Sequence, residues 1–379
     1  MQVDGPRARR YDGAVQRKGI LMARMTASIL LALLVLGPVA QATETPAPAA
    51  PAAKAPTIET PLPTFRDLVP QLAYDGKPDT FYQSARPPQA DETFTMTFAQ
   101  PVRLKRVEVL TGSPDGKGTL EAGVLETSAD GKAFSKVAKF VSGAAKADLT
   151  GAEVKAVRLR VTAEASASLA IREITLDAQP AVPVFAYPVE IRLDYTEVPE
   201  MKEWCEKAAR TADEWYPKIA EILKSDGYTP TRRISLIFKK GQKGIAGTSG
   251  SKIVCYDGWF KAHPDDVGAI IHEVIHVVQA YPKYDPPWLV EGLADYVRFW
   301  MYEAKPPSRR LDPNRIKYTD SYQVTGAFLA WAVKNGNPDL VTKLNVILRK
   351  GEYKESTFKD ITGKDLDTLW EEFKKSLSQ

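Results

Sequence analysis

Two histidines and a glutamate in the second half of the chain have the types and the spacing that metal chemistry requires. The motif His272-Glu273-Val274-Ile275-His276 places two imidazoles four residues apart. On a helix, such residues share one face and lie about 6 Å apart along the axis, so both can bind one tetrahedral Zn²⁺ ion. Glu273 follows the first histidine directly, where its carboxylate can take a proton from a water molecule at the metal.

A chance match, with both histidines as ordinary core residues, is the alternative interpretation. Only three histidines occur in the 379 residues, so composition alone would give this arrangement about once in a thousand such sequences. The neighbouring residues are mostly apolar, which predicts a buried helix over residues 265–280. Imidazoles without partners in such a helix would be costly to bury, and this favours a bound ion.

A third metal ligand is expected near the motif, because a catalytic zinc site uses three protein ligands and keeps one position open. No histidine follows His276, and the pattern that needs Gly at 279 and His or Asp at 282 is excluded by Gln279 and Pro282. Glu291 and Asp295 form E-x-x-x-D. We assign Glu291 to the metal and Asp295 to the outer N–H of a ligand histidine, with a solvated Asp295 as the alternative.

Helical periodicity dominates the second half of the chain, which must position these residues. Apolar residues recur at spacings of three and four from 201 to 223, and the residues at 234–238 read as a strand. A glycine-rich turn region over 244–256 leads into another strand. Further helices are predicted over 265–280, 288–301, 321–334 and 365–376. This half is expected to be an α+β domain in which helices outweigh strands.

The first half has the strand period of two. Thr93–Phe98 alternates strictly, and residues 102–110, 154–161 and 169–176 alternate loosely. Asp-Gly pairs, which signal turns, occur at 75–76, 115–116 and 130–131. Short alternating strands with such turns predict an antiparallel β-sandwich over residues 64–180.

Four segments of this half resemble the discoidin, or coagulation-factor C-type, sandwich, a jelly-roll fold used by many carbohydrate-binding modules. They are residues 74–82, 98–109, 127–134 and 171–174. The resemblance implies a carbohydrate ligand and a structural Ca²⁺ site, and hard oxygen donors on a tight loop suit that ion. The implied calcium ligands are Asp75, Asp79, Thr80 and Glu173. A plain Asp-Gly turn without a metal is the alternative.

Four segments of the second half resemble the basic secretory protein family of plants and bacteria, whose members are treated as gluzincin-type zinc peptidases. They are residues 272–279, 288–298, 321–331 and 365–370. The resemblance implies a metallopeptidase domain over residues 188–379 that acts on proteins or glycoproteins by Glu-assisted attack of zinc-bound water. Gluzincins also use a downstream Tyr or His to stabilise the oxyanion, which makes Tyr322 the candidate here. A core tyrosine is the alternative.

The N-terminus has the features of a secretory signal peptide over residues 1–42. A basic stretch precedes the apolar run Ile29–Leu36 and the small-x-small sequence Ala40-Gln41-Ala42. The run is shorter than the roughly 20 residues that span a bilayer. An Ala/Pro-rich linker is expected over residues 43–63. We therefore expect a secreted or periplasmic protein with no integral membrane segment after cleavage.

Charge and cysteine content limit the remaining possibilities. Removing residues 1–42, with six cations and two anions, from totals of 51 Lys and Arg and 47 Asp and Glu leaves 45 of each sign. A neutral chain does not predict a nucleic-acid partner. Cys205 and Cys255 could form a disulfide in an oxidising compartment, with buried free thiols as the alternative. The competing function is a secreted glycan- or surface-binding protein with a non-catalytic zinc site.

Overall fold

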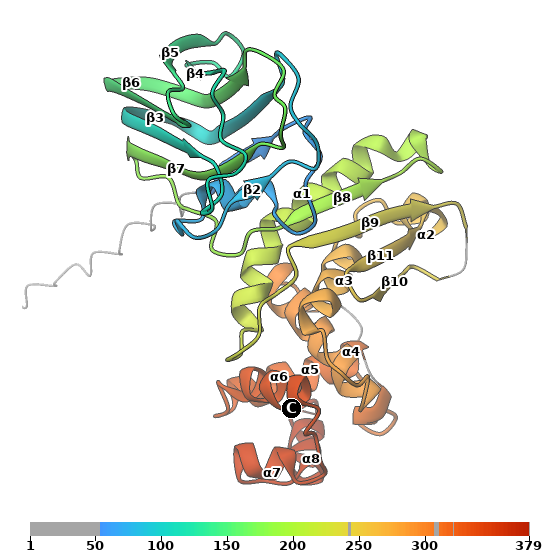
Figure 1. Cartoon of the computed structure of the whole chain (residues 1–379). Coiled ribbons are helices and arrows are strands. Elements are labelled where there is room, and N and C mark those ends of the chain that lie inside the picture. The colour runs from blue at the N-terminus through green and yellow to red at the C-terminus, as the bar shows by residue number, and fades with distance from the viewer. Residues whose placement is uncertain (1–53, 242–243, 307–310, 321, 379) are drawn as a thin grey trace, which may run out of the picture. The chain divides into compact units, whose positions relative to one another are not determined.

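The structure is a computed structural model of the chain and describes residues 54–241, 244–306, 311–320 and 322–378. The expected signal peptide, residues 1–42, and the expected linker up to residue 53 lie outside these residues. The described part contains a β-sandwich domain and an α+β domain (Figure 1), as the two periodicities predicted. None of the described helices has the length and apolar character needed to cross a membrane.

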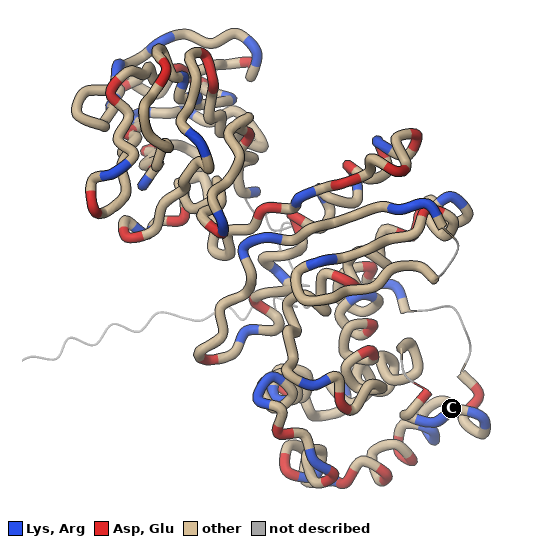
Figure 2. Tube along the Cα trace, turned by 45° about the vertical axis from the view of Figure 1, so that its right-hand side comes forward, with Lys and Arg blue, Asp and Glu red and all other residues tan. Residues whose placement is uncertain are grey.

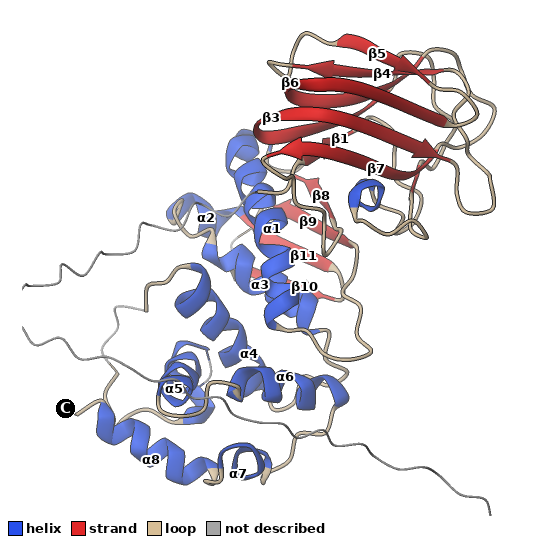
Figure 3. Cartoon of the chain, turned by 90° about the vertical axis from the view of Figure 1, so that its left-hand side faces the viewer, coloured by secondary structure: helices blue, strands red, loops and turns tan. Residues whose placement is uncertain are grey.

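Two long antiparallel strands, β3 (Thr93–Thr111) and β6 (Ala144–Val161), form the centre of the sandwich (Figure 3). Their pairing shifts register at two places, after Thr97 and after Leu104, and such irregularities bend strands. The first half of β3 pairs with β1, whereas its second half pairs with β7. The two strands therefore contribute to both layers of the sandwich.

The shorter strands complete the two layers. β4 and β5 extend the layer that contains the first half of β3, and β2 extends the other layer beside β7. Phe94 and Met96 from one half of β3 and Leu104 and Val107 from the other half lie in the same buried apolar cluster. The elements are β1 (Thr57–Glu59), a 3-10 helix (Pro70–Tyr74), β2 (Tyr82–Gln83), β4 (Gly123–Ser128), β5 (Ser135–Lys139) and β7 (Ala170–Gln179).

The linker expected over residues 43–63 was too long at its C-terminal end. Residues 57–59 form β1 and pair with residues 95–97 of β3, and Leu62 is buried. The run of Ala and Pro ends at Pro56, and the following Thr-Ile-Glu has residues that favour strands. The sandwich therefore begins several residues earlier than its alternating pattern indicated.

The α+β domain is built on a mixed sheet with the order β10-β11-β9-β8. β8 and β11 run parallel to β9, and β10 is an antiparallel edge strand beside β11. Along β9, Ile234, Leu236 and Phe238 are buried while the residues between them are partly exposed, so the apolar side chains share one face. The strands are β8 (Glu190–Asp194), β9 (Arg233–Lys239), β10 (Ala246–Ser249) and β11 (Lys252–Tyr256).

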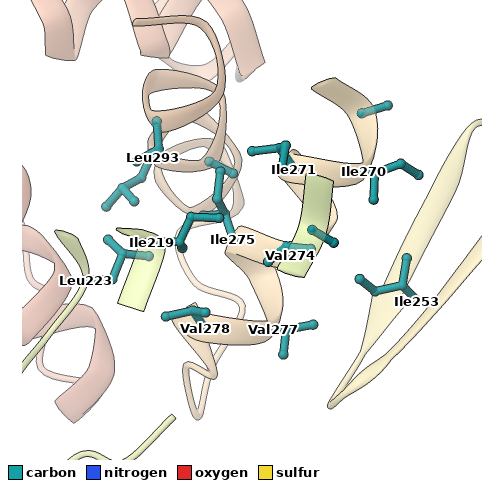
Figure 4. Close-up of a cluster of buried hydrophobic side chains, with 14 of the residues drawn as sticks. Ile219, Leu223, Ile253, Ile270, Ile271, Val274, Ile275, Val277, Val278 and Leu293 are labelled. Atoms are coloured by element: carbon teal, nitrogen blue, oxygen red, sulfur yellow. The ribbon is translucent and has the colours of Figure 1, made fainter. Parts of the chain in front are cut away.

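Helices α1 (Lys202–Ile222) and α3 (Gly268–Gln279) pack against each other and against this sheet. Figure 4 shows side chains of α3 pointing toward Ile219 and Leu223 and, on another side, toward Ile253 of β11. Eleven of the twelve residues of α3 are buried. Apolar side chains on most of its surface therefore fix this helix, which leaves the face with the histidines as its polar side.

The remaining helices follow along the chain after the sheet. The predicted helices at 265–280, 288–301, 321–334 and 365–376 are present with shifts of a few residues, and the second of them changes to a π-helix after Tyr296. The elements are α2 (Asp257–Ala262), α4 (Pro287–Tyr296), the π-helix (Val297–Tyr302), α5 (Tyr322–Lys334), α6 (Leu340–Lys350), α7 (Thr357–Thr362) and α8 (Leu366–Ser376).

Helix α6, which the sequence analysis did not predict, ties together the C-terminal ends of α1 and α3. Asn345 is fully buried, and its Nδ2 donates to Leu223 O at 2.9 Å. Arg349 donates to Leu223 O at 2.7 Å and to Val278 O at 3.1 Å. These bonds satisfy carbonyl groups that a helix end leaves without partners, so α6 holds the end of α3 in place.

The expected disulfide between Cys205 and Cys255 is not formed, and both cysteines are buried free thiols. Both lie in the apolar core cluster of the α+β domain. Burial raises the pKa of Cys205 to about 12 and that of Cys255 well above its ordinary value. Because both stay protonated, they act as small apolar side chains, as the alternative interpretation held.

Charged residues of both signs are interspersed along both domains (Figure 2). Many of them form exposed ion pairs, such as Arg106 with Asp148 and Lys364 with Glu372. Exposed pairs contribute little to stability. The free energy of folding therefore comes mainly from the two apolar cores.

We predict that Gly292→Ala destabilises the α+β domain. A Cβ at position 292 would lie 2.2 Å from the Cβ and Cγ2 of Thr325, where α4 crosses α5. Higher helix propensity would favour alanine by about 1 kcal/mol, whereas overpacking costs about 1–3 kcal/mol, so a net loss is expected. Denaturant unfolding measures it. Gly247→Ala, where the new Cβ would meet no atom within 4 Å, is the control, and equal stability of both variants would contradict the prediction.

Candidate metal centre

Helices α3 and α4 bring two imidazoles and one carboxylate together. The Nε2 atoms of His272 and His276 lie 3.0 Å apart. Glu291 Oε2 lies 3.0 Å from His272 Nε2 and 3.4 Å from His276 Nε2. All three ligand atoms lie within 4.8 Å of one another, and this is the one such group of three found among the described residues.

The chemistry of this donor set fits a zinc ion. Two nitrogens and one oxygen are the protein ligands of many catalytic zinc sites, and the three atoms here point at a common centre. His272 and Glu291 are only 8% and 7% exposed. Buried lone pairs that converge in this way repel one another unless a proton or a cation lies between them.

Each imidazole is oriented by a contact at its other ring nitrogen, Nδ1. His272 Nδ1 lies 2.8 Å from Asp295 Oδ1, which is the contact expected for this carboxylate. His276 Nδ1 lies 2.7 Å from Gln279 Oε1, and Gln279 Nε2 donates to Val290 O. An oxygen acceptor beside each Nδ1 keeps the proton on that nitrogen, so each Nε2 can offer its lone pair to a metal. Asp295 is buried rather than solvated.

The same contacts set the charge of the ligands. Burial acts to lower the pKa of His272, but its hydrogen bonds to Asp295 and Glu291 outweigh burial and raise it to about 9. For Glu291, burial acts to raise the pKa, but the two imidazoles hold it well below the ordinary range. The site therefore keeps a negative carboxylate that favours a positive charge at its centre.

Glu273 lies beside this centre and is held by the edge strand of the sheet. Its side chain is 9% exposed. Thr248 Oγ1, on β10, donates to Glu273 Oε2 at 2.7 Å. The sequence alone does not point to Thr248, because no spacing rule connects residues of β10 and α3.

Two tyrosines with exposed side chains lie at the site. Tyr322 is 53% exposed, and its ring stacks on His272 with the ring centroids 6.1 Å apart, so the alternative of a core tyrosine is wrong. Tyr284, in the loop between α3 and α4, donates a hydrogen bond from its hydroxyl to Glu291 Oε1. Tyr284 was not predicted from the sequence, because it lies outside any periodic segment.

These residues line a cleft of about 1130 Å³. Its walls come from the edge strand β10, from α3 and α4, and from the start of α5. The volume is large enough for a ligand with several rotatable groups. The polar residues of the cleft include Thr248, Glu273, His276, Tyr284, Glu291 and Tyr322.

The candidate calcium residues of the sandwich are only partly brought together. Thr80 Oγ1 lies 2.8 Å from Asp75 Oδ1, and the backbone N–H of Lys77 also donates to Asp75. Burial, together with the negative charge of Asp75, raises the pKa of Glu173 to about 7. The turn thus closes on Asp75, while Asp79 is exposed.

The family of the α+β domain follows from a comparison with protein-family models. Residues 196–373 match the BSP family, described as peptidase of plants and bacteria. They form a BSP peptidase domain. This agrees with the resemblance found in the sequence, and the BSP domain contains all the residues of the candidate metal centre.

The solved structures that are similar to part of the chain include two bacterial modules. One is a module of a family 31 glycoside hydrolase from Clostridium perfringens, which is 18% identical with a TM-score of 0.29. The match covers 33% of this chain and 94% of the module. A fucose-binding module from Streptococcus pneumoniae is 16% identical, with TM-score 0.28 and 33% and 95% coverage. At such values, the sugars named for these modules are properties of those proteins alone. A search of curated proteins found no match.

We predict that Asp295→Asn weakens zinc binding about 10–100-fold, the usual cost of losing an outer partner of a metal histidine. The amide is as large as the carboxylate but removes the charge beside His272 Nδ1. Competition with a fluorescent chelator measures the affinity. Glu371→Gln, an exposed change on α8, should bind zinc like the wild type, and equal affinity of Asp295→Asn and the wild type would refute the role assigned to Asp295.

Proposed function

We propose that the BSP domain is a zinc-dependent peptidase that hydrolyses peptide bonds of proteins or glycoproteins. The observation that carries the proposal is the convergence of His272, His276 and Glu291 beside the carboxylate of Glu273, in an open cleft. Each of these residues is buried or nearly so and has an outer contact that orients it, so the arrangement is preorganised.

His272, His276 and Glu291 would hold the zinc ion. Zinc at such a site polarises a carbonyl group and lowers the pKa of a water molecule. Asp295 and Gln279 fix the orientation of the two imidazoles through their Nδ1 atoms. The protein therefore contributes both the ligands and the contacts that keep them aligned.

Glu273 acts as general base and then as general acid. Its carboxylate takes the proton of the attacking water and passes it to the nitrogen of the leaving amine. Thr248 holds one oxygen of this carboxylate through its hydroxyl, which leaves the other oxygen free for the water.

The edge strand β10 is the proposed surface for the substrate backbone. β10 pairs with β11 on one side and is the terminal strand of its sheet, so its other edge can pair with an extended peptide. Four residues of this strand and its turn, Ala246, Gly247, Thr248 and Gly250, line the cleft. A peptide paired there would pass beside Glu273.

Tyr322 is the proposed donor to the oxyanion that forms when the carbonyl is attacked. Its ring lies over His272 at the cleft. Among the described residues, its hydroxyl has no hydrogen-bond partner, which leaves it available to the substrate. One such donor typically contributes about 10²–10³-fold to the rate of acyl transfer.

For the sandwich, we propose a structural Ca²⁺ ion between Asp75 and Glu173. Glu173 Oε2 is buried without a hydrogen-bond partner among the described residues, and the charge of Asp75 acts on the same carboxylate. A divalent cation with oxygen ligands would compensate both negative charges. Thr80 would contribute through its hydroxyl in place of the exposed Asp79.

A sugar ligand of the sandwich and export from the cytoplasm remain proposals. The first rests on the sequence resemblance of residues 64–180 and the second on residues 1–42. The competing function, a glycan- or surface-binding protein with a non-catalytic zinc site, shares the zinc but predicts no hydrolysis. A protein digest inhibited by a chelator and restored by Zn²⁺ separates the two.

We predict that Glu273→Gln keeps one zinc per chain and lowers kcat about 10²–10⁴-fold, because the amide cannot accept the proton of water. His272→Ala should lose both zinc and hydrolysis. Elemental analysis and a mass-spectrometric digest of an unfolded protein measure the two properties. Glu371→Gln is the matched control on the surface. Hydrolysis by Glu273→Gln at the wild-type rate would show that the general base is wrongly assigned.

We predict that Ca²⁺ stabilises the sandwich through Glu173. Without a metal, the pKa of Glu173 rises from 4.5 in the unfolded chain to about 7 in the folded state, so the folded state binds the proton more tightly and stability falls as the pH rises between these values. At about pH 8, Ca²⁺ should therefore raise the unfolding midpoint of the wild type. Calorimetry of the full chain measures it.

Glu173→Gln should lose this response to Ca²⁺, because it removes one of the two charges. Glu153→Gln, an exposed change on β6 of the same sandwich, should keep it. If Ca²⁺ raised the unfolding midpoint equally in the wild type and in Glu173→Gln, the proposed calcium site at Glu173 would be wrong.

A further inference from the structure

The two oxygens of the Glu291 carboxylate have different partners. Oε2 faces both imidazoles, at 3.0 Å from His272 Nε2 and 3.4 Å from His276 Nε2. Oε1 points the other way and accepts the hydroxyl proton of Tyr284. Glu291 itself is buried on α4, so only these neighbours decide which oxygen meets an ion.

Tyr284 is placed for this contact by the loop between the two ligand-bearing helices. Helix α3 ends at Gln279, the next residue Ala280 has a left-handed backbone, and α4 begins at Pro287. The ring of Tyr284 is 57% exposed and lies at the cleft. The tyrosine therefore contributes little to the core, while its hydroxyl donates to Glu291.

A carboxylate can bind a metal through one oxygen or through both. At a catalytic zinc site, a second oxygen from the same carboxylate would compete for the coordination position that water and substrate need. A hydrogen bond from a phenol uses the lone pair and part of the charge of the oxygen that accepts it. That oxygen is then a weaker metal ligand than its neighbour.

We infer that Tyr284 is a positioning residue that keeps Glu291 a one-oxygen ligand. Its hydroxyl occupies Oε1, so only Oε2 binds the ion, and the fourth position stays open. The inference rests on the proposed zinc site and adds a residue to it. It also separates the two tyrosines of the cleft. Tyr322 stacks on His272, and its hydroxyl has no partner in the part of the chain that the structure describes, whereas the hydroxyl of Tyr284 donates to Glu291.

The test compares Tyr284→Phe with the wild type after replacement of zinc by Co²⁺, whose visible absorption is stronger in four-coordinate than in five-coordinate sites. The variant should still bind one Co²⁺ per chain, but its spectrum should weaken as Glu291 binds through both oxygens. The zinc form should lose about 10–100-fold in kcat, with KM nearly unchanged because the cleft keeps its shape.

Two control variants remove a tyrosine hydroxyl without touching Glu291. Tyr187→Phe deletes a comparable bond, from a phenol to Glu221 at 2.8 Å, and should change neither spectrum nor rate. Tyr322→Phe should slow hydrolysis but keep the wild-type spectrum. The inference would be overturned if Tyr284→Phe kept the wild-type Co²⁺ spectrum. It would also be overturned if this variant no longer bound Co²⁺. A wild-type chain that binds no metal would instead overturn the proposed zinc site.

Discussion

The buried convergence of two imidazole nitrogens and one carboxylate oxygen is the constraint on which the rest of the BSP domain depends. His272, His276 and Glu291 meet within 4.8 Å, where water cannot hydrate them freely. Such a group is costly to bury unless a cation compensates it. The outer contacts of Asp295 and Gln279 add polar groups to the interior, and each is hydrogen-bonded. The surrounding fold serves to hold this group rigid.

Rigidity comes from the packed faces of α3 and from its C-terminal end. Its apolar faces pack on α1 and on the sheet (Figure 4), and the side chain of Gln279 joins it to α4 through Val290 O. Arg349 of α6 holds the carbonyl of Val278 at the end of the helix. Close packing of α4 on α5 at Gly292 then fixes the third ligand. Elements as far apart in the sequence as α1 and α6 thus help to set the distances of 3.0 to 3.4 Å between the three atoms.

Local patterns were enough to predict the two domains, most helices and the grouping of His272, His276 and Glu291. His272 and His276 share a helix turn, and Glu291 with Asp295 has its own spacing, so sequence alone carries their geometry. Thr248 and Tyr284 could not be predicted, because their contacts depend on how β10 and a loop pack beside α3. The prediction of a disulfide was wrong for a similar reason. Spacing in the sequence cannot show that Cys205 and Cys255 both lie as free thiols in an apolar core. The early start of the sandwich at β1 was missed because three residues are too few to show a period.

We propose that one ion binds between these three atoms. Crystals of the chain soaked in Zn²⁺ and measured at the zinc absorption edge test it most directly. We expect one anomalous peak roughly 2.0–2.2 Å from His272 Nε2, His276 Nε2 and Glu291 Oε2. No peak at this position, or a peak bound by the imidazoles with Glu291 turned away, would contradict the account.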